Sequence, residues 1–409
     1  MMFRFTSNAL NIARYLVIFI LIALMFSPAI TNLAELLLVI TLVSSAELRQ
    51  RIISTSKQPM VIGAIFFYII IGIGVLYSIG DHKEAIGMLS GWRKILLLPL
   101  AVALFDETKW KFRLVISLIT AASIFCLLSY IGVITHIYFP VPEHVLGITL
   151  RNHATQGMIF AVAAFSAATL AISLSKLSIN FRLALVTTSI LMIANIAFIT
   201  NGRSGYIVLI VCSASIIIGL LISSRKTTVK SISITLVSLA VVSATLATPS
   251  SHQRIAQAFN ELQHYKAATE VTSMGIRMYF WKNTLEMIAK KPLIGYGTGA
   301  FETAYKNQIA GQTGIAATIT SDPHNQFLKI ATEHGLLGLL AFLAFLASSL
   351  RQKASAPYRI LGLGVLAAWM ATSLANSHFS TFSEGVFIYT LMGAMLANES
   401  SPDVNHAKI

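Results

Sequence analysis

Long apolar runs recur along the whole chain, and they constrain the fold more than any other feature of the sequence. Segments such as Val61 to Ser78 and Leu336 to Leu350 stay apolar on every face of a helix. Helical runs of about 17–22 apolar residues can cross a hydrocarbon core of about 30 Å. Membrane β-strands would instead alternate between apolar and polar residues. We therefore predict an all-α, polytopic integral membrane protein.

Composition excludes other classes of protein. Of the 409 residues, 56% are apolar and only 11% are charged, which rules out a water-soluble enzyme. The net charge is +14, but the 30 Lys and Arg residues are dispersed through short loops, as membrane topology requires. A nucleic-acid partner is therefore not expected. Cys126 and Cys212 lie inside apolar runs, which predicts packing roles rather than a disulfide or a metal site.

The pattern predicts about 12 transmembrane helices, with the first apolar run retained rather than cleaved as a signal. The expected spans are residues 11–27, 30–46, 59–79, 90–105, 114–135, 153–175, 183–200, 205–223, 231–248, 328–350, 360–376 and 384–397. The fourth span has a short apolar stretch after Lys94. It either includes Trp92, Arg93 and Lys94 within the bilayer or enters at an angle.

Lys and Arg are concentrated in the short loops of one side, which indicates that both termini are cytoplasmic. The expected domains are residues 1–248 with helices 1–9, an outer helical loop or lid domain at 249–323, and residues 324–409 with helices 10–12 and a short cytoplasmic tail. Within the outer domain, helical spacing predicts helices over 251–268 and 275–290. The glycines of 295–299 lack a preceding strand and predict a turn.

Cationic residues at helix ends on the outer side are the first candidates for chemistry. Arg203 lies in a short connector, Thr200 to Gly205, and Arg93 and Lys94 adjoin the short fourth span. These side chains either bind an anionic substrate or have a structural explanation: Arg203 would extend to lipid phosphates, and Arg93 and Lys94 would lie in a broken helix solvated at the headgroups. Both alternatives stay open from position alone.

Two further candidates come from the outer domain and its return to the membrane. Arg277 lies on the expected helix 275–290, four residues before Trp281, where a solvated helix face is the alternative. His324 follows Pro323 where the chain re-enters the membrane, and it acts there either as a base or as a helix cap. The outer domain contains no metal-ligand spacing and no phosphate-binding glycine loop, so no metal and no cofactor are expected.

Taken in order, several motifs match a known family together. They are Arg277, Trp281, Lys291 to Phe301, Asp322 to Leu328 and Glu333 to Gly338. In this order and membrane context, the chain resembles the O-antigen ligase and O-antigen polymerase superfamily of bacterial envelope enzymes. The segments Val271 to Arg277 and Asn201 to Arg203 and the pair His324–Asn325 are more similar to the ligase branch.

The resemblance implies a fold of the GT-C-type membrane glycosyltransferases in the bacterial inner membrane, with the active site facing the periplasm. It implies transfer of O-antigen glycan from undecaprenyl diphosphate to the lipid A core oligosaccharide in lipopolysaccharide biosynthesis, with inversion and without metal. It also implies that Arg203, Arg277 and His324 are catalytic. Candidate residues for binding the diphosphate or the acceptor are Arg93, Lys94, Trp281 and Asn325.

The chemistry supports these roles. A departing lipid diphosphate needs fixed cations in a site without metal, and arginine forks hold phosphate oxygens in pairs. A sugar hydroxyl needs a base to take its proton, and His324 is the candidate. In-line displacement predicts that His324 lies across a cavity from the arginines. Both lipid substrates should approach sideways between helices.

Two alternatives remain. A polymerase would join carrier-linked repeat units and would need no lipid A core. A secondary transporter would suit twelve helices with cytoplasmic termini, but the sequence shows no clear pair of interrupted helices in matching halves.

Overall fold

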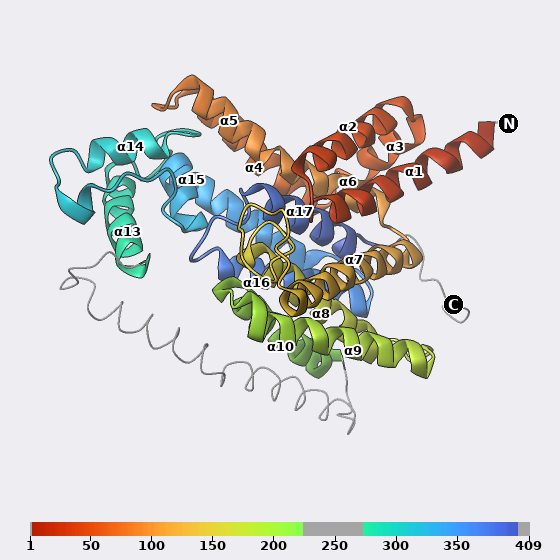
Figure 1. The fold of residues 1–409 in the computed structure, drawn as a ribbon. Helices are drawn as coiled ribbons and strands as arrows, with labels where there is room; N and C mark the ends of the chain where they lie inside the picture. Colours follow the sequence, from red (N-terminus) through yellow and green to blue (C-terminus); the bar gives the residue numbers. More distant parts are fainter. Residues whose placement is uncertain (1, 224–272, 400–409) are drawn as a thin grey trace.

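The computed structural model describes residues 2–223 and 273–399, and within these ranges the chain is helical and has no strands (Figure 1). The all-α prediction is confirmed for this part of the chain. The first range contains α1 (Met2–Ala23), α2 (Pro28–Ser44), α3 (Ala46–Thr55), α4 (Pro59–Leu76), α5 (His82–Trp92), η1 (Arg93–Leu96), α6 (Leu97–Leu104), α7 (Thr108–Thr135), α8 (His153–Ser173), α9 (Ile179–Asn195), η2 (Ile196–Thr200) and α10 (Arg203–Ser223). The second contains α13 (Ser273–Lys290), α14 (Phe301–Gln308), η3 (Gly314–Ala317), α15 (Gln326–Ser348), η4 (Ser349–Arg351), α16 (Ala356–Thr372) and α17 (Phe382–Leu396).

Six helical segments are long and apolar enough to cross a membrane, and the bent pair α2–α3 would make a seventh. The six are Pro59–Leu76, His82–Leu104, Thr108–Thr135, His153–Ser173, Ile179–Thr200 and Gln326–Arg351. The described chain therefore has the helices of a multi-pass membrane protein.

The expected count of about 12 spans is not confirmed. Parts of α1, α10 and α17 are apolar but shorter than a full span. The expected span 231–248 and the expected outer helix 251–268 lie outside the described residues. Every other expected span overlaps a helix in the structure. The total number of spans, the domain boundaries and the sides of the membrane stay predictions.

The expected second span, 30–46, differs from a straight membrane helix. Its helix α2 ends at Ser44, and α3 leaves at an angle of 97°. Ser45 is extended (φ −111°), and its side chain accepts the backbone N–H of Leu48. Ser45 therefore ends one helix and caps the next, because its hydroxyl accepts a backbone N–H that has no acceptor within the new helix.

The short fourth span is part of a longer helix. Residues His82–Leu104 form one candidate span through α5, η1 and α6, so Arg93 and Lys94 lie within it rather than before it. The tight turn η1 precedes Pro99, which has no N–H and crowds the carbonyl four residues earlier. Whether Trp92, Arg93 and Lys94 lie within the bilayer or the segment enters it at an angle stays a prediction.

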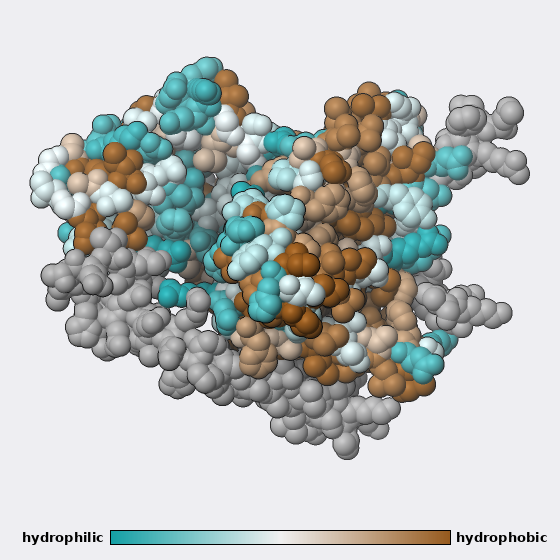
Figure 2. Space-filling model, viewed as in Figure 1, coloured by the Kyte–Doolittle hydropathy of each residue, from teal (hydrophilic) through white to brown (hydrophobic). Residues whose placement is uncertain are grey.

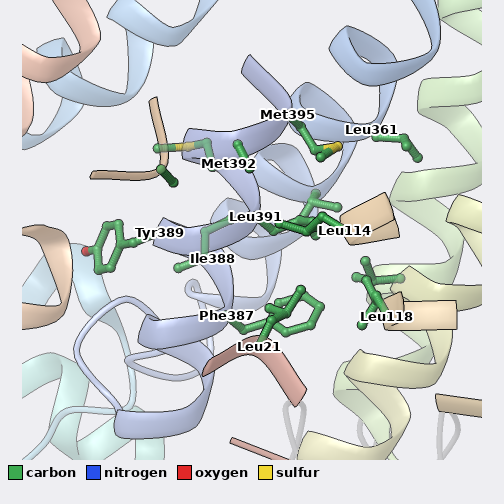
Figure 3. Packing of buried hydrophobic residues seen from close by; sticks show 14 of the residues in the cluster. Leu21, Leu114, Leu118, Leu361, Phe387, Ile388, Tyr389, Leu391, Met392 and Met395 are labelled. Carbon is green, nitrogen blue, oxygen red and sulfur yellow. The ribbon is translucent and has the colours of Figure 1, made fainter. Parts of the chain in front are cut away.

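The interior of the bundle is a single large apolar core. Helix α17 runs through its middle, and its residues Phe387 and Leu391 belong to the same apolar cluster as Leu21 of α1, Leu114 of α7 and Leu361 of α16 (Figure 3). On the face shown in Figure 2, broad hydrophobic areas lie over the bundle, whereas hydrophilic residues gather over α5 and α14. An apolar exterior suits lipid, because helices in a bilayer need not hide apolar side chains. The two cysteines are buried and unpaired, as predicted.

Helices α13 and α14 form a small outer unit beside the start of α15 (Figure 1). The unit has its own apolar cluster, made of Phe280, Met287, Phe301, Ala304, Tyr305 and Ile309. The predicted helix 275–290 is confirmed as α13.

A glycine turn joins this outer unit to the bundle. Gly295, Gly297 and Gly299 all have positive φ, which confirms the predicted turn. A side chain on Gly297 would overlap the backbone of Ser78, just after α4. The Thr298 N–H donates to the carbonyl of Gly74 at 3.0 Å. The turn therefore lies directly against α4, in a space that only glycine fits.

Helix α15 is interrupted where the same turn meets it. Gly335 has φ 64° and ψ −167°, and its neighbours Leu336 and Leu337 donate their N–H groups to the carbonyls of Pro292 and Leu293. A Cβ on Gly335 would overlap the backbone of Leu293. The interruption fixes the outer unit against the start of α15, which is also the segment that follows His324.

Candidate functional site

His324 lies in the short connection that leads into α15. It has a left-handed backbone conformation (φ 55°), and its N–H donates to Asp322 Oδ1 at 2.7 Å. The next residue, Asn325, caps α15 by accepting the N–H groups of Phe327 and Leu328. The imidazole is therefore carried on a turn whose backbone is fixed on both sides of it.

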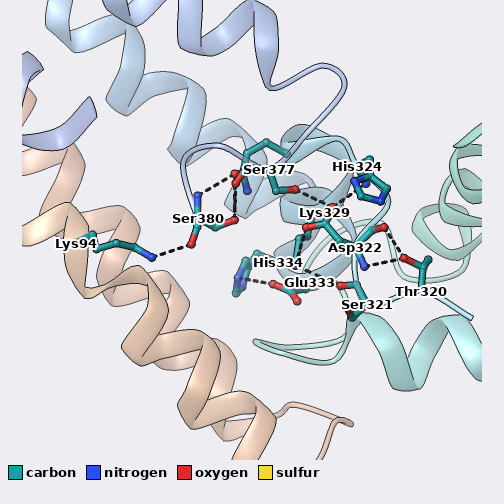
Figure 4. Close-up of polar contacts among 11 residues, drawn as sticks. Lys94, Thr320, Ser321, Asp322, His324, Lys329, Glu333, His334, Ser377 and Ser380 are labelled. Carbon is teal, nitrogen blue, oxygen red and sulfur yellow. Dashed lines mark hydrogen bonds and ion pairs between the residues drawn. The ribbon is translucent and has the colours of Figure 1, made fainter. Parts of the chain in front are cut away.

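Asp322 is the centre of the polar contacts around this turn (Figure 4). Its Oδ1 also accepts the hydroxyl of Ser377 at 2.8 Å, and its Oδ2 pairs with Lys329 Nζ at 3.1 Å. Ser377 belongs to the connection between α16 and α17, and Lys329 belongs to α15. One carboxylate thus links three segments of the chain.

Helix α13 covers the other side of the turn. Trp281 Nε1 donates to the carbonyl of Pro323 at 2.9 Å, and the Phe280 ring is stacked with the His324 ring at 6.3 Å between centroids. Arg277 precedes these residues by three and four positions, so it occupies the same side of α13. The helix therefore brings a guanidinium and two aromatic rings to the His324 turn.

Arg203 is the first residue of α10. The preceding turn is shaped by Asn201, which is left-handed (φ 47°) and accepts the hydroxyl of Tyr206 at 3.0 Å. Gly205 lies against Gly157 of α8, where an added Cβ would be 3.0 Å from the Gly157 Cα. This close helix contact places Arg203 at the positive end of α10, where an anion is favoured.

The two arginines and the histidine form one electrostatic cluster. Burial lowers the pKa of Arg277, the charge of Arg203 lowers that pKa further, and Asp322 opposes both. Burial also lowers the pKa of His324; Asp322 opposes this effect, whereas Arg277 and Lys329 add to it. Arg277 is thus within electrostatic reach of both Arg203 and His324. A lowered pKa keeps the imidazole neutral near pH 7, which a general base requires.

Lys94 and Arg93 point to different partners. The buried Lys94 donates to the carbonyl of Ser380 at 2.8 Å, in the same α16–α17 connection that Ser377 joins to Asp322 (Figure 4). Arg93 instead donates to Asn32 Oδ1 at 2.6 Å on α2. Lys94 is therefore linked to the His324 turn through the connection, and Arg93 faces α2.

The side chains of Trp281 and Asn325 have structural partners. The Trp281 indole is engaged by Pro323, and the Asn325 amide both caps α15 and donates to the carbonyl of Leu374 at 3.0 Å. Roles of Arg93, Lys94, Trp281 and Asn325 in substrate binding stay predictions, as does the expected cavity between His324 and the arginines.

Sequence reasoning missed several polar residues of this region. Asp322 was visible beside His324, and its position two residues earlier is typical of an aspartate that accepts the backbone N–H of a turn. Ser377, Ser380 and Lys329 carried no such signal, because the first two lie more than 50 residues along the chain and the third is a single lysine at the start of an expected span. Within residues 2–223 and 273–399, no three His, Cys, Asp or Glu side chains converge as metal ligands would.

An apolar cavity of about 950 Å³ lies elsewhere in the bundle, between α10, α15 and α16. Its walls include Ile218, Leu343, Ala347, Leu363 and Ala367, and none of the charged cluster lines it. The cavity suits hydrocarbon rather than a glycan or a diphosphate, so the charged cluster is the better candidate for chemistry.

Comparison with known families identifies this part of the chain. Residues 187–343 match the family model described as O-antigen ligase. The chain carries an O-antigen ligase domain. A comparison with curated proteins gave no match. The O-antigen ligase domain indicates a membrane enzyme of the O-antigen ligase/polymerase type and does not distinguish ligase from polymerase.

The O-antigen ligase domain includes all three residues of the charged cluster. It extends from α9 into α15 and so contains Arg203, Arg277 and His324, together with Asp322 and Lys329. Lys94 and Ser377 lie outside the matched residues. The predicted superfamily is therefore confirmed by the segment that carries the predicted catalytic residues.

Proposed function

We propose that the protein is an O-antigen ligase that transfers O-antigen glycan from undecaprenyl diphosphate to the lipid A core oligosaccharide. The observation that carries the proposal is the cluster of Arg203, Arg277 and His324 within the O-antigen ligase domain. The site faces the periplasm in this proposal, and both termini are cytoplasmic. The substrates are lipid-linked O-antigen and lipid A core.

The two arginines act on the leaving group. When the bond between the anomeric carbon and the diphosphate oxygen breaks, negative charge accumulates on the diphosphate. Fixed guanidinium groups stabilise that charge in a partly buried site, and the N-terminus of α10 beside Arg203 adds a favourable dipole. We assign the same task to Arg277. Its guanidinium is partly buried beside a second arginine, and an anion would offset the energy cost of placing these two positive charges together.

His324 acts on the acceptor. Its neutral imidazole takes the proton of a sugar hydroxyl while the hydroxyl oxygen forms a bond to the anomeric carbon, on the face opposite the diphosphate. The new glycosidic bond replaces the bond to the diphosphate, so the configuration at the anomeric carbon inverts. General-base assistance of this kind contributes about 10²–10⁴-fold in rate.

Reconstitution tests this function. Purified protein in liposomes should transfer glycan from the undecaprenyl diphosphate carrier to lipid A core, giving a slower band on a gel. Transfer should persist in excess chelator. Failure to glycosylate lipid A core with an active donor preparation would reject the ligase.

The polymerase is separated from the ligase by the same assay without lipid A core. A polymerase would lengthen carrier-linked glycan under these conditions, because the growing chain is its own acceptor. A ligase would leave the carrier-linked glycan at its original length. Appearance of longer carrier-linked products would therefore favour the polymerase.

A further inference from the structure

We propose that Asp322 is a positioning residue that holds His324 in place for catalysis. Lys329 and Ser377 in turn hold Asp322. The inference rests on the proposed function of His324 as the base. The Asp322 carboxylate fixes where the His324 imidazole lies relative to α13, and it need not touch the substrate itself.

The first argument is geometric. The His324 N–H donates to Asp322 Oδ1, so a side chain two residues earlier closes the turn. His324 is one of a few residues other than glycine with positive φ in the described chain. A left-handed conformation is unfavourable for a residue with a Cβ and persists only where its surroundings impose it. The hydrogen bond to Asp322 supplies part of that constraint.

The second argument concerns what holds Asp322. Its carboxylate receives Ser377 from the α16–α17 connection and Lys329 from α15 (Figure 4). Thr320 closes the same turn from the other end by donating its hydroxyl to the Asp322 carbonyl at 2.7 Å. The carboxylate is therefore fixed by one helix and one interhelical connection, neither of which belongs to the turn.

The third argument concerns the opposite side of the turn. Trp281 and Phe280 of α13 contact Pro323 and the His324 ring, and Arg277 extends from the same helix. The imidazole thus lies between α13 and a turn anchored by Asp322. Loosening the anchor would change the distance from the imidazole to the arginines without removing any group that contacts them.

Charge gives the proposal a specific readout. The charged groups that face His324 are Asp322 on its own turn, Arg277 on α13 and Lys329 on α15. His378, from the α16–α17 connection, in turn faces Asp322. Asp322 raises the pKa of His324 against burial and both cations. Removing this negative charge should therefore lower the pKa of His324 further.

The test uses the full-length protein and Asp322→Asn. We expect kcat to fall by about 10²-fold, the loss that a misplacement of about 1 Å can cause, with little change in Kd for undecaprenyl diphosphate-linked glycan. The acid limb of the kcat profile should move to lower pH. Asp81→Asn is the matched control, because it makes the same chemical change at an exposed aspartate.

A second variant guards against misfolding. Asp322→Asn alone leaves Lys329 buried opposite a neutral amide, so Asp322→Asn/Lys329→Met removes both members of the pair and should restore expression without restoring kcat. Ser377→Ala should lower kcat less than Asp322→Asn, and Ser377→Thr, which keeps the hydroxyl, should retain activity.

NMR titration of ¹³C-labelled histidine provides a readout that does not depend on transfer, with the His324 signal assigned from its absence in His324→Gln. A His324 pKa unchanged by Asp322→Asn would overturn the inference, as would a kcat equal to that of the Asp81→Asn control. If the wild-type protein transfers no glycan, the proposed function fails, while the titration still decides whether Asp322 controls His324.

Discussion

At the scale of single residues, two arginines from different helices share one region of positive charge. Arg203 begins α10, and Arg277 lies on the same side of α13 as Phe280, whose ring is stacked with that of His324. The charge of Arg203 lowers the pKa of Arg277, so the two guanidinium groups repel each other in the absence of an anion. In the proposed function, a bound diphosphate would offset this repulsion.

The first prediction concerns this pair. Arg203→Ala and Arg277→Ala should each lower kcat by about 10²–10³-fold, because each removes a fixed donor to the departing charge. Arg203→Lys and Arg277→Lys should recover only part of the activity, since lysine lacks the planar fork. Arg182→Ala on α9 is the control. Normal transfer by a well-expressed Arg203→Ala protein would exclude Arg203 from the site.

The second prediction concerns pH. Burial lowers the pKa of His324 below its ordinary value of 6.5, so the neutral base persists into mildly acid solution. The kcat of transfer should be constant above that pKa and should fall as pH drops through it, with a midpoint below 6.5. His324→Gln should bind donor but fail to turn it over, and His82→Gln on α5 should behave as wild type. A midpoint above 6.5 would contradict the assignment.

At the scale of helices, the sequence predicted where most helices lie but not how they are interrupted. Apolar runs identify membrane helices because the bilayer requires continuous apolar surface, whatever their partners are. The bend at Ser45, the tight turn at Arg93 and the interruption at Gly335 depend instead on caps, proline and neighbouring backbone. Those contacts come from distant segments, so a single sequence does not specify them.

The third prediction tests the interruption of α15. Gly335→Ala should lower the free energy of unfolding by roughly 1–3 kcal/mol, because a Cβ at positive φ overlaps the backbone of Leu293. Gly87→Ala in α5 is the matched control: the space around it is open, and alanine there should stabilise by about 0.5–1 kcal/mol.

Thermal unfolding can be followed with a thiol-reactive dye, since Cys126 and Cys212 are both buried in the folded protein. Equal melting temperatures for Gly335→Ala and wild type would show that the interruption is not required for stability.

The candidate site shows the same division between local and distant information. Arg203 and His324 were predicted from their places at helix ends, Arg277 from its place on the expected outer helix, and all three from a family resemblance carried by local motifs. The partner of Lys94 was not predictable, because Ser380 follows it by 286 residues and bonds through its backbone carbonyl. Backbone acceptors leave no mark in a sequence.

At the scale of the whole molecule, the fourth prediction concerns orientation. If the outer unit faces the periplasm, Lys306→Cys on α14 should react with an impermeant maleimide in intact spheroplasts. Arg49→Cys on α3 should react only after permeabilisation, since Arg49 is expected on the cytoplasmic side. The native cysteines are buried and should give little background. The reverse labelling pattern would invert the proposed topology.

The glycine turn at 295–299 has a consequence for engineering. Its backbone is bonded both to α4, through Gly74, and to α15, through Glu333. If α13 and α14 alone were transplanted from a relative with a different donor preference, the glycine turn would no longer match the backbone of α4 and α15 that it contacts. A chimera intended to change glycan specificity should therefore exchange residues 71–78 and 332–337 together with the outer unit. The turn and the helix segments that it contacts would then come from the same protein.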